Sequence, residues 1–141
     1  MILLDTNVVS EPLRPAPSRT VIDWLDRHFS DCWISSLVVF ELGAGIAVLP
    51  AGRRRDVLQA SIVRSVRRFG ARVLPFDTAA AEAAARLVGE ARSAGMGIQQ
   101  LPAKLADLQT AGIASAHGLQ LATRNLADFK GLGLDLIDPW A

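Results

Sequence analysis

The sequence has one cysteine and no long apolar run. Cys32 is the single cysteine among 141 residues, which excludes an internal disulfide and fits a reducing compartment; we expect it to be a small buried side chain in a strand. No segment approaches the roughly 18 apolar residues of a membrane-spanning helix. Met1–Leu4 reaches Asp5 with no basic segment before it, so no signal peptide is expected. These absences predict a cytoplasmic protein with no membrane association, folded as one domain over residues 1–141.

The chain also lacks a strong excess of charge of either sign. Its formal net charge is +1, so composition alone does not indicate a protein that binds nucleic acid. The basic residues are nearly all arginine, and the run Arg53-Arg54-Arg55 is followed by Arg64, Arg67 and Arg68. Two interpretations stay open: a solvated helix face, or an edge that binds phosphate or a partner through the bidentate guanidinium group.

Short apolar runs alternate with longer segments of helical period. The runs predict five strands: Met1–Leu4, Cys32–Ser35, Arg72–Phe76, Leu119–Thr123 and Leu134–Ile137. The longer segments predict helices that begin after Ser18, at Ser35 or Ser36, at Gly52, after Asp77 and near Lys104. Strands alternating with helices predict a three-layer α/β/α sandwich around a parallel sheet of about five strands. Because ligands bind at the carboxyl ends of such strands, the candidate site lies in the region of Asp5, Glu41, Asp77 and Asn125.

Three carboxylates lie in segments with no other charge. Each is the only charged residue of its segment if histidine is neutral: Asp5 in residues 1–10, Glu41 in 32–52 and Asp107 in 105–123. Carboxylates in such apolar segments are expected to be drawn inward, where an unpaired charge costs several kcal/mol. We expect no lysine or arginine beside them, and a shared divalent cation is one way for them to coexist.

Each acid alone has a structural alternative. Asp5 can cap the turn after its strand, and Asp107 can favour the dipole of its helix, whereas a structural role for Glu41 in mid-helix is harder to find. Taken together, the three acids favour a metal site. Carboxylates without a histidine or cysteine cluster suit Mg²⁺ or Mn²⁺ rather than zinc, and such metals indicate phosphoester chemistry.

Four short motifs follow one another along the chain: Asp5-Thr6-Asn7 after the first strand, Glu41 with Gly45, Asp107 with the helix that follows, and Thr123-Arg124-Asn125 with Asp128. In this order they resemble the motifs of PIN-domain nucleases. The ending Ile137-Asp138-Pro139-Trp140 resembles the branch that contains VapC-like and FitB-like toxins. The resemblance covers essentially the whole chain. Two departures stand out: Asn125 occupies the fourth acidic position, and the stretch 95–103 is longer than expected before the third motif.

The resemblance implies an endoribonuclease toxin with Mg²⁺ or Mn²⁺ in an acidic pocket. Asp5 and Asp107 would be the principal metal ligands, and Glu41 a further ligand or the group that positions water. Thr6 and Asn7, together with Thr123 and Arg124, would position substrate, and either Asn125 or Asp128 would complete the site. The family further implies a homodimer and a VapB-like antitoxin from an adjacent gene, assembled as a heterotetramer or larger.

Two other functional classes stay open. One is a phosphatase or phosphoacceptor domain that uses a strand-end aspartate, either Asp5 or Asp77, although Asp77 is most simply a helix cap. The other is a non-catalytic binding module with the same fold. The apolar helices around 38–49 and 58–69 are expected to line a groove for the amphipathic segment of a partner.

Overall fold

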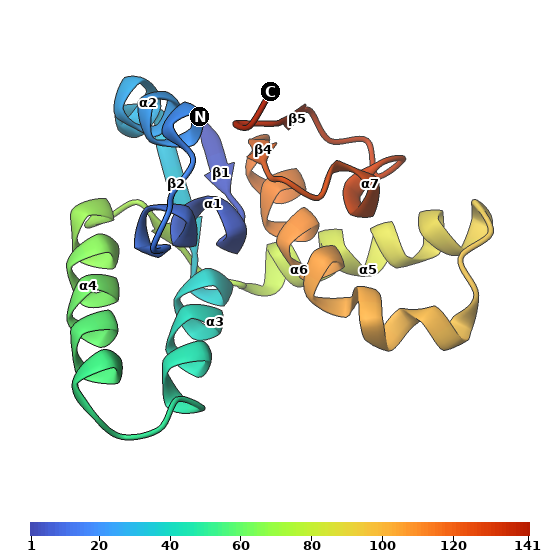
Figure 1. Ribbon diagram of the computed structural model, residues 1–141. Coiled ribbons are helices and arrows are strands. Elements are labelled where there is room, and N and C mark those ends of the chain that lie inside the picture. Colours follow the sequence, from blue (N-terminus) through green and yellow to red (C-terminus); the bar gives the residue numbers. More distant parts are fainter.

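The computed structural model describes residues 1–141 and contains a five-stranded sheet whose neighbouring strands all run parallel (Figure 1). The strand order is β3-β2-β1-β4-β5. The strands are β1 (Ile2–Leu4), β2 (Cys32–Ser35), β3 (Val73–Leu74), β4 (Gln120–Ala122) and β5 (Leu136–Ile137). The five predicted runs are therefore confirmed as strands, although four of them are shorter than the sequence pattern suggested.

Helices connect the strands and cover both faces of the sheet. The α-helices are α1 (Thr6–Ser10), α2 (Arg19–His28), α3 (Ser36–Ala47), α4 (Arg53–Phe69), α5 (Thr78–Ser93), α6 (Leu101–His117) and α7 (Leu126–Phe129). Three short 3₁₀ helices are η1 (Glu11–Leu13), η2 (Phe29–Asp31) and η3 (Ile98–Gln100). None of the helices combines the length and apolarity that crossing a lipid bilayer requires.

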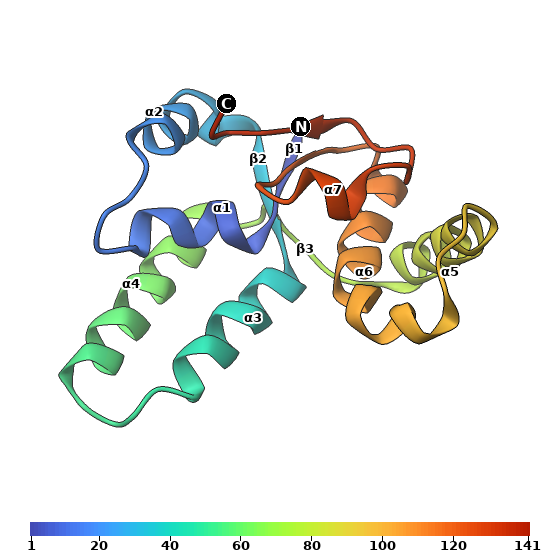
Figure 2. The same ribbon diagram turned by 45° about the vertical axis from the view of Figure 1, so that its right-hand side comes forward.

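Alternation along β1 divides the core into two halves. Ile2 and Leu4 pack with the buried side chains of α1 to α4, whereas Leu3 points to the opposite face and packs with α5, α6 and α7. This alternation is the two-residue period of a strand covered on both sides. The predicted three-layer α/β/α sandwich is confirmed, and Figure 2 shows the two groups of helices on opposite sides of the strands.

The helix starts agree with the local signals at two of the predicted caps. Ser35 accepts a hydrogen bond from the backbone N–H of Val38 and begins α3, and Asp77 accepts one from Ala80 and begins α5. Ser18 precedes α2, but its hydroxyl makes no capping bond, and its backbone N–H donates to Glu11 instead. The expectation of a Ser18 side-chain cap is therefore wrong, because a buried carboxylate holds the backbone at this point.

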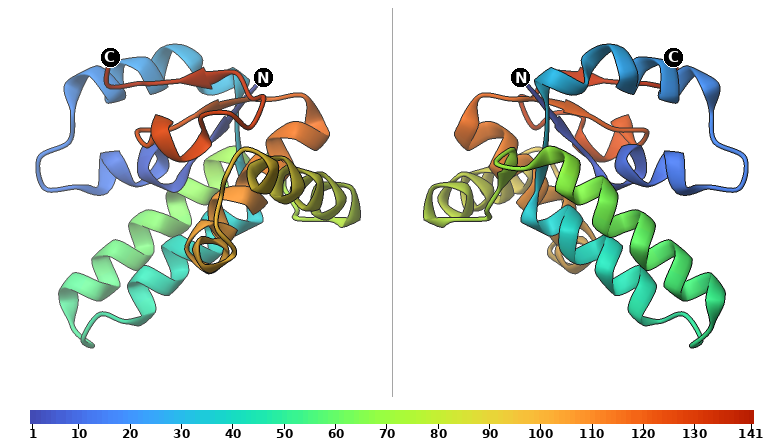
Figure 3. Two further views of the ribbon diagram at one scale, coloured as in Figure 1. Left: turned by 90° about the vertical axis from the view of Figure 1, so that its right-hand side faces the viewer. Right: turned by 90° about the vertical axis from the view of Figure 1, so that its left-hand side faces the viewer.

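Two pairs of helices pack against each other, one pair on each face of the sheet. Helices α3 and α4 lie side by side and project away from the sheet (Figure 3). On the other face, α5 and α6 approach closely at Gly112, where an added Cβ would lie 2.6 Å from the Ala80 carbonyl oxygen. Because α6 carries Asp107, this close contact fixes the position of that acid relative to the sheet.

Candidate active site

The Asp5 carboxylate lies at the carboxyl end of β1, beside β4, where the chain reverses its order across the sheet. Oδ1 accepts a hydrogen bond from the Thr6 backbone N–H at 2.8 Å. Oδ2 accepts from the Asn7 amide at 2.7 Å and from the Thr123 hydroxyl at 2.7 Å. Asp5 is also the N-cap of α1, so the capping role and a place in the site coexist in this residue.

Thr123 joins β4 to this network from a fully buried position. Its hydroxyl donates to Asp5 and accepts from the Asn7 amide at 3.3 Å and the Asn125 backbone N–H at 3.0 Å. One donor and both lone pairs of the hydroxyl are thereby used. The two strand ends are locked together, and the orientation of the Asp5 carboxylate is fixed.

Thr6 connects the first acid to the second. Its backbone N–H donates to Asp5, while its hydroxyl donates to Glu41 Oε2 on α3. Glu41 is half-buried, as the apolar sequence around it led us to expect. A single residue therefore bridges two of the three candidate acids, which are 36 positions apart in the chain.

The pKa of Asp107, on α6, depends on the charges of the other acids. Burial raises the pKa of the Asp107 carboxyl, and the negative charges of Asp128, Asp5 and Glu41 raise it further, while Lys104 acts in the opposite sense. Each of these carboxylates therefore contributes to the potential at Asp107. The site is a region of concentrated negative charge that includes all three predicted acids and Asp128.

Lys104 is the residue that sequence reasoning missed. It lies one helical turn before Asp107 on α6, and its ammonium group donates to the Asp128 carboxylate on α7. This hydrogen bond raises the pKa of Lys104, so the side chain is protonated at neutral pH. The expectation that no basic residue lies near the acids is wrong, and the three-residue spacing before Asp107 was the available signal.

Carboxylate oxygens are the donors that Mg²⁺ and Mn²⁺ prefer, and this set contains no histidine or cysteine. No three acidic, histidine or cysteine side chains of the chain converge closely enough to enclose a metal ion. The arrangement is open rather than a closed cage. An open set of oxygens fits Mg²⁺, which commonly keeps several waters and takes only one or two protein carboxylates.

A family model described as PIN domain matches residues 2–132, which is most of the sequence. The chain belongs to the PIN-domain family. The VapC ribonuclease Y4jK of Sinorhizobium fredii (strain NBRC 101917 / NGR234) is 39% identical to it, over 99% of this chain and 98% of the relative. Toxin FitB of Neisseria gonorrhoeae (strain ATCC 700825 / FA 1090) is 38% identical, over 99% of both chains.

A solved structure is similar to this PIN domain over nearly its full length. The crystal structure of FitAcB from Neisseria gonorrhoeae superposes with a TM-score of 0.88 at 37% identity, over 99% of each chain. The same fold is thus found in a protein related in sequence.

The remaining predicted site residues differ in how they contact the hydrogen-bond network around Asp5. Arg124 donates its backbone N–H to the Asn7 side chain at 3.2 Å, and its guanidinium carbon lies 5.5 Å from the centre of the Trp140 ring. Asn125 is exposed, and only its backbone joins the network. Asp77, the alternative strand-end aspartate, caps α5 as predicted.

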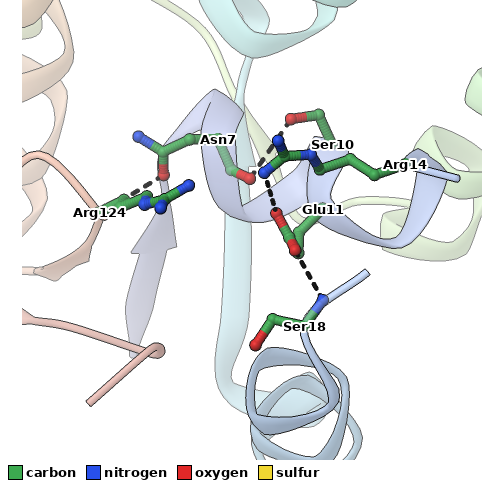
Figure 4. A network of polar contacts seen from close by, with 6 residues as sticks. All are labelled: Asn7, Ser10, Glu11, Arg14, Ser18 and Arg124. Atoms are coloured by element: carbon green, nitrogen blue, oxygen red, sulfur yellow. Dashed lines mark hydrogen bonds and ion pairs between the residues drawn. The ribbon is translucent and has the colours of Figure 1, made fainter. Parts of the chain in front are cut away.

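Glu11 is a fully buried acid beside the site, and the sequence did not single it out. Its carboxylate accepts from the Ser18 backbone N–H at 2.7 Å and from the Arg14 guanidinium at 3.1 Å (Figure 4). The Ser18 hydrogen bond is the main cause that lowers the pKa of Glu11, and the charges of Arg14 and Arg124 lower it too. Glu11 holds the loop after η1 and lies between two arginines.

Cys32 has no part in this chemistry. It is fully buried in β2, and burial raises the pKa of its thiol to about 11. A thiol with so high a pKa is neither a nucleophile nor a metal ligand at neutral pH. The prediction of a small buried side chain is confirmed.

Proposed function

We propose that this PIN domain is a toxin-type endoribonuclease that hydrolyses RNA phosphodiester bonds with Mg²⁺ or Mn²⁺ held by Asp5, Glu41 and Asp107, in part through metal-bound water. The observation that supports it most is the coupling of these three acids. Thr6 binds both Asp5 and Glu41, and the charges of both raise the pKa of Asp107. The name of the ribonuclease relative agrees with this chemistry.

Some residues of the chain would hold the metal ligands in place, and others would position the substrate. A bound divalent cation would activate water and neutralise charge on the scissile phosphate. Thr6, Asn7 and Thr123 fix the Asp5 carboxylate, so little reorganisation is needed when a ligand binds. The guanidinium group of Arg124 would supply positive charge for a substrate phosphate that lies beside the acids.

Asp128 and Asn125 differ in what they offer to the site. The Asp128 charge reaches Asp107, whereas the Asn125 side chain is exposed and contributes only its backbone N–H to the network. We therefore assign metal affinity to Asp128 and substrate contact to Asn125.

A phosphatase or phosphoacceptor role for Asp5 is disfavoured by its neighbours. The phosphatase motif needs an aspartate where Asn7 stands, and neither role explains the contact of Thr6 with Glu41. Asp77 uses its carboxylate to cap α5. A non-catalytic module is the remaining alternative, and a Mg²⁺ titration that detects no binding would favour it.

The proposed function includes an antitoxin partner and a homodimer, as the FitB-like toxins imply. Helices α3 and α4 form a groove of about 380 Å³, lined by apolar side chains that include Val39, Ile46, Ile62 and Val66. A groove of this kind fits the apolar face of an amphipathic helix. A VapB-like antitoxin with an arginine that reaches the acids would block the site, in a heterotetramer or larger assembly.

The test is RNA cleavage by the purified chain, freed of any antitoxin. We expect cleavage with Mg²⁺ or Mn²⁺ and none with excess EDTA. Asp5→Asn, Glu41→Gln and Asp107→Asn should each lose at least about a hundredfold in rate, because each removes a charge from the site. Glu82→Gln, an exposed substitution on α5, serves as the control of equal charge change. Equal cleavage in EDTA would disprove the metal-dependent mechanism.

A further inference from the structure

A hollow lined by arginines lies at the far end of α1 from the acids. Its volume is about 690 Å³, and its lining includes Ser10, Leu13, Arg14, Arg53, Arg54 and Leu58. We call this hollow the arginine cleft. It is formed by η1 on one side and the first turns of α4 on the other, and it shares no lining residue with the apolar groove between α3 and α4.

The positive charges of the arginine cleft are free to bind an anion. Neither Arg53 nor Arg54 takes part in an ion pair within the chain. Arg14 pairs with Glu11, which is 4% exposed, while the Arg14 side chain itself is 54% exposed. The buried carboxylate therefore orients the guanidinium group through one N–H donor, and the other donors have no hydrogen-bond partner in the chain.

The placement of Arg53, Arg54 and Arg55 is unfavourable for α4 itself. Basic residues in the first turn of a helix oppose its dipole, and Asp56 is the only acid there. The sequence thus concentrates positive charge where it lowers helix stability. A bound anion would remove that unfavourable interaction.

A series of polar contacts also connects the arginine cleft to the acids. Asn7 binds Asp5 and accepts from the Arg124 backbone N–H, and the Arg124 charge acts on Glu11. Glu11 in turn binds Arg14; the Asn7–Arg124 and Glu11–Arg14 contacts are drawn in Figure 4. Helices α1 and η1 span roughly 13 Å between the acids and the cleft, from their rise per residue. A few nucleotides of single-stranded RNA would cover this separation.

We infer that the arginine cleft binds the phosphodiester backbone of single-stranded RNA whose scissile phosphate lies at Asp5, Glu41 and Asp107. This inference rests on the proposed ribonuclease function. Arg14, Arg53 and Arg54 would contact phosphates with no selection of base, because guanidinium–phosphate contacts carry no sequence information. Apolar Leu13 and Leu58 leave room for a base or a ribose against the cleft wall.

The test measures binding of a labelled single-stranded RNA oligonucleotide in EDTA, where cleavage is prevented. Arg53→Ala/Arg54→Ala should weaken binding about tenfold at low salt and reduce the slope of log K against log salt by about 1.4, for two lost phosphate contacts. Arg14→Gln should act in the same direction. Arg64→Ala/Arg86→Ala removes the same charge from exposed positions outside the cleft and should leave the slope unchanged.

Cleavage in Mg²⁺ separates this inference from the function on which it rests. We expect the cleft variant to raise KM for RNA while kcat stays within about twofold, and unfolding curves that match the wild type would exclude misfolding. Cleavage by the wild type with unchanged RNA binding by the cleft variant would overturn the inference and leave the function standing. Equal loss of RNA binding in the control variant would overturn the inference as well. So would a cleft variant that loses binding to a protein partner but keeps its binding to RNA.

Discussion

At the residue scale, Asp107 is a site residue whose ionisation the fold disfavours. Burial and the charges of Asp128, Asp5 and Glu41 raise its pKa, so the ionised carboxylate is less favourable in the folded chain than in the unfolded one. Ionisation of Asp107 therefore opposes folding, and this cost appears as pH rises through the pKa of the carboxyl. A cation bound among the acids would reverse the effect.

We expect Asp107→Asn to stabilise the metal-free protein at neutral pH. The gain should be about 1 kcal/mol, or about 3 °C in Tm for a chain of this size, because one of several like charges is removed. The measurement is thermal unfolding in EDTA, with exposed Asp135→Asn as control. Added Mg²⁺ should then raise the Tm of the wild type more than that of Asp107→Asn. A lower Tm for the variant in EDTA would contradict the assignment.

Glu11 shows the opposite linkage with pH. Its pKa is lowered from the ordinary value of 4.5, so ionised Glu11 stabilises the fold above that pH, and the contribution is lost as pH falls through the lowered pKa. We expect Glu11→Gln to cost about 1–3 kcal/mol at neutral pH, since a buried charge-assisted hydrogen bond is removed. Urea unfolding between pH 7 and pH 3 should show the difference from wild type shrinking toward the acid end. A constant difference over this range would contradict the role of the charge.

At the element scale, α6 and α7 are joined by an ion pair that partly neutralises the negative charge of the site. Lys104 on α6 donates to Asp128 on α7, and both side chains are about one-third exposed, at 37% and 36%. A pair this exposed contributes little to stability, of the order of 0.2–1 kcal/mol. Its effect on the potential at Asp107 is the more important one.

This arrangement predicts a non-additive result for metal binding. Asp128→Ala should weaken Mg²⁺ binding about fivefold or more, because it removes one negative charge and leaves Lys104 unpaired beside Asp107. Lys104→Ala/Asp128→Ala should recover part of that loss. Calorimetric Mg²⁺ titration of the two single variants and the double variant completes the cycle. Full additivity would contradict the coupling between Lys104 and Asp128, and unchanged Mg²⁺ affinity in Lys104→Ala would show that Lys104 does not act on the site.

At the scale of the whole molecule, the apolar groove between α3 and α4 leads to a prediction about assembly. Val63 lines this groove and is 40% exposed, so a charge there should leave the core intact. We expect Val63→Asp to reduce binding of the proposed antitoxin at least about tenfold, because a carboxylate would be buried unpaired. Val48→Asp, at the residue that follows α3, is the control, since Val48 is exposed and lies outside the groove.

Size-exclusion chromatography of the co-expressed proteins would provide the measurement. The wild type and Val48→Asp should elute with the antitoxin, and Val63→Asp should elute apart from it. Co-elution of Val63→Asp at dilute concentration would show that the groove is used by something other than the antitoxin.

The sequence alone determined the features that depend on neighbouring residues. The alternation of apolar runs and helical segments gave the three-layer sandwich, and the local caps at Ser35 and Asp77 marked two helix starts correctly. The charge-poor segments around Asp5, Glu41 and Asp107 singled out the acids. Such signals act over a few residues, so composition and spacing are sufficient to find them.

Only the tertiary structure decided how those residues meet. The Thr123–Asp5 hydrogen bond joins residues 118 positions apart, and Lys104 pairs with an acid 24 positions away. The short helix α1 forms where Asp5 caps it and α3 packs against it, whereas its five residues alone give too weak a periodic signal. Burial of Glu11 and exposure of Asn125 likewise depend on which strands and helices become neighbours. Side-chain partners at such separations are set by the packing of the sheet and its helices, which no local pattern encodes.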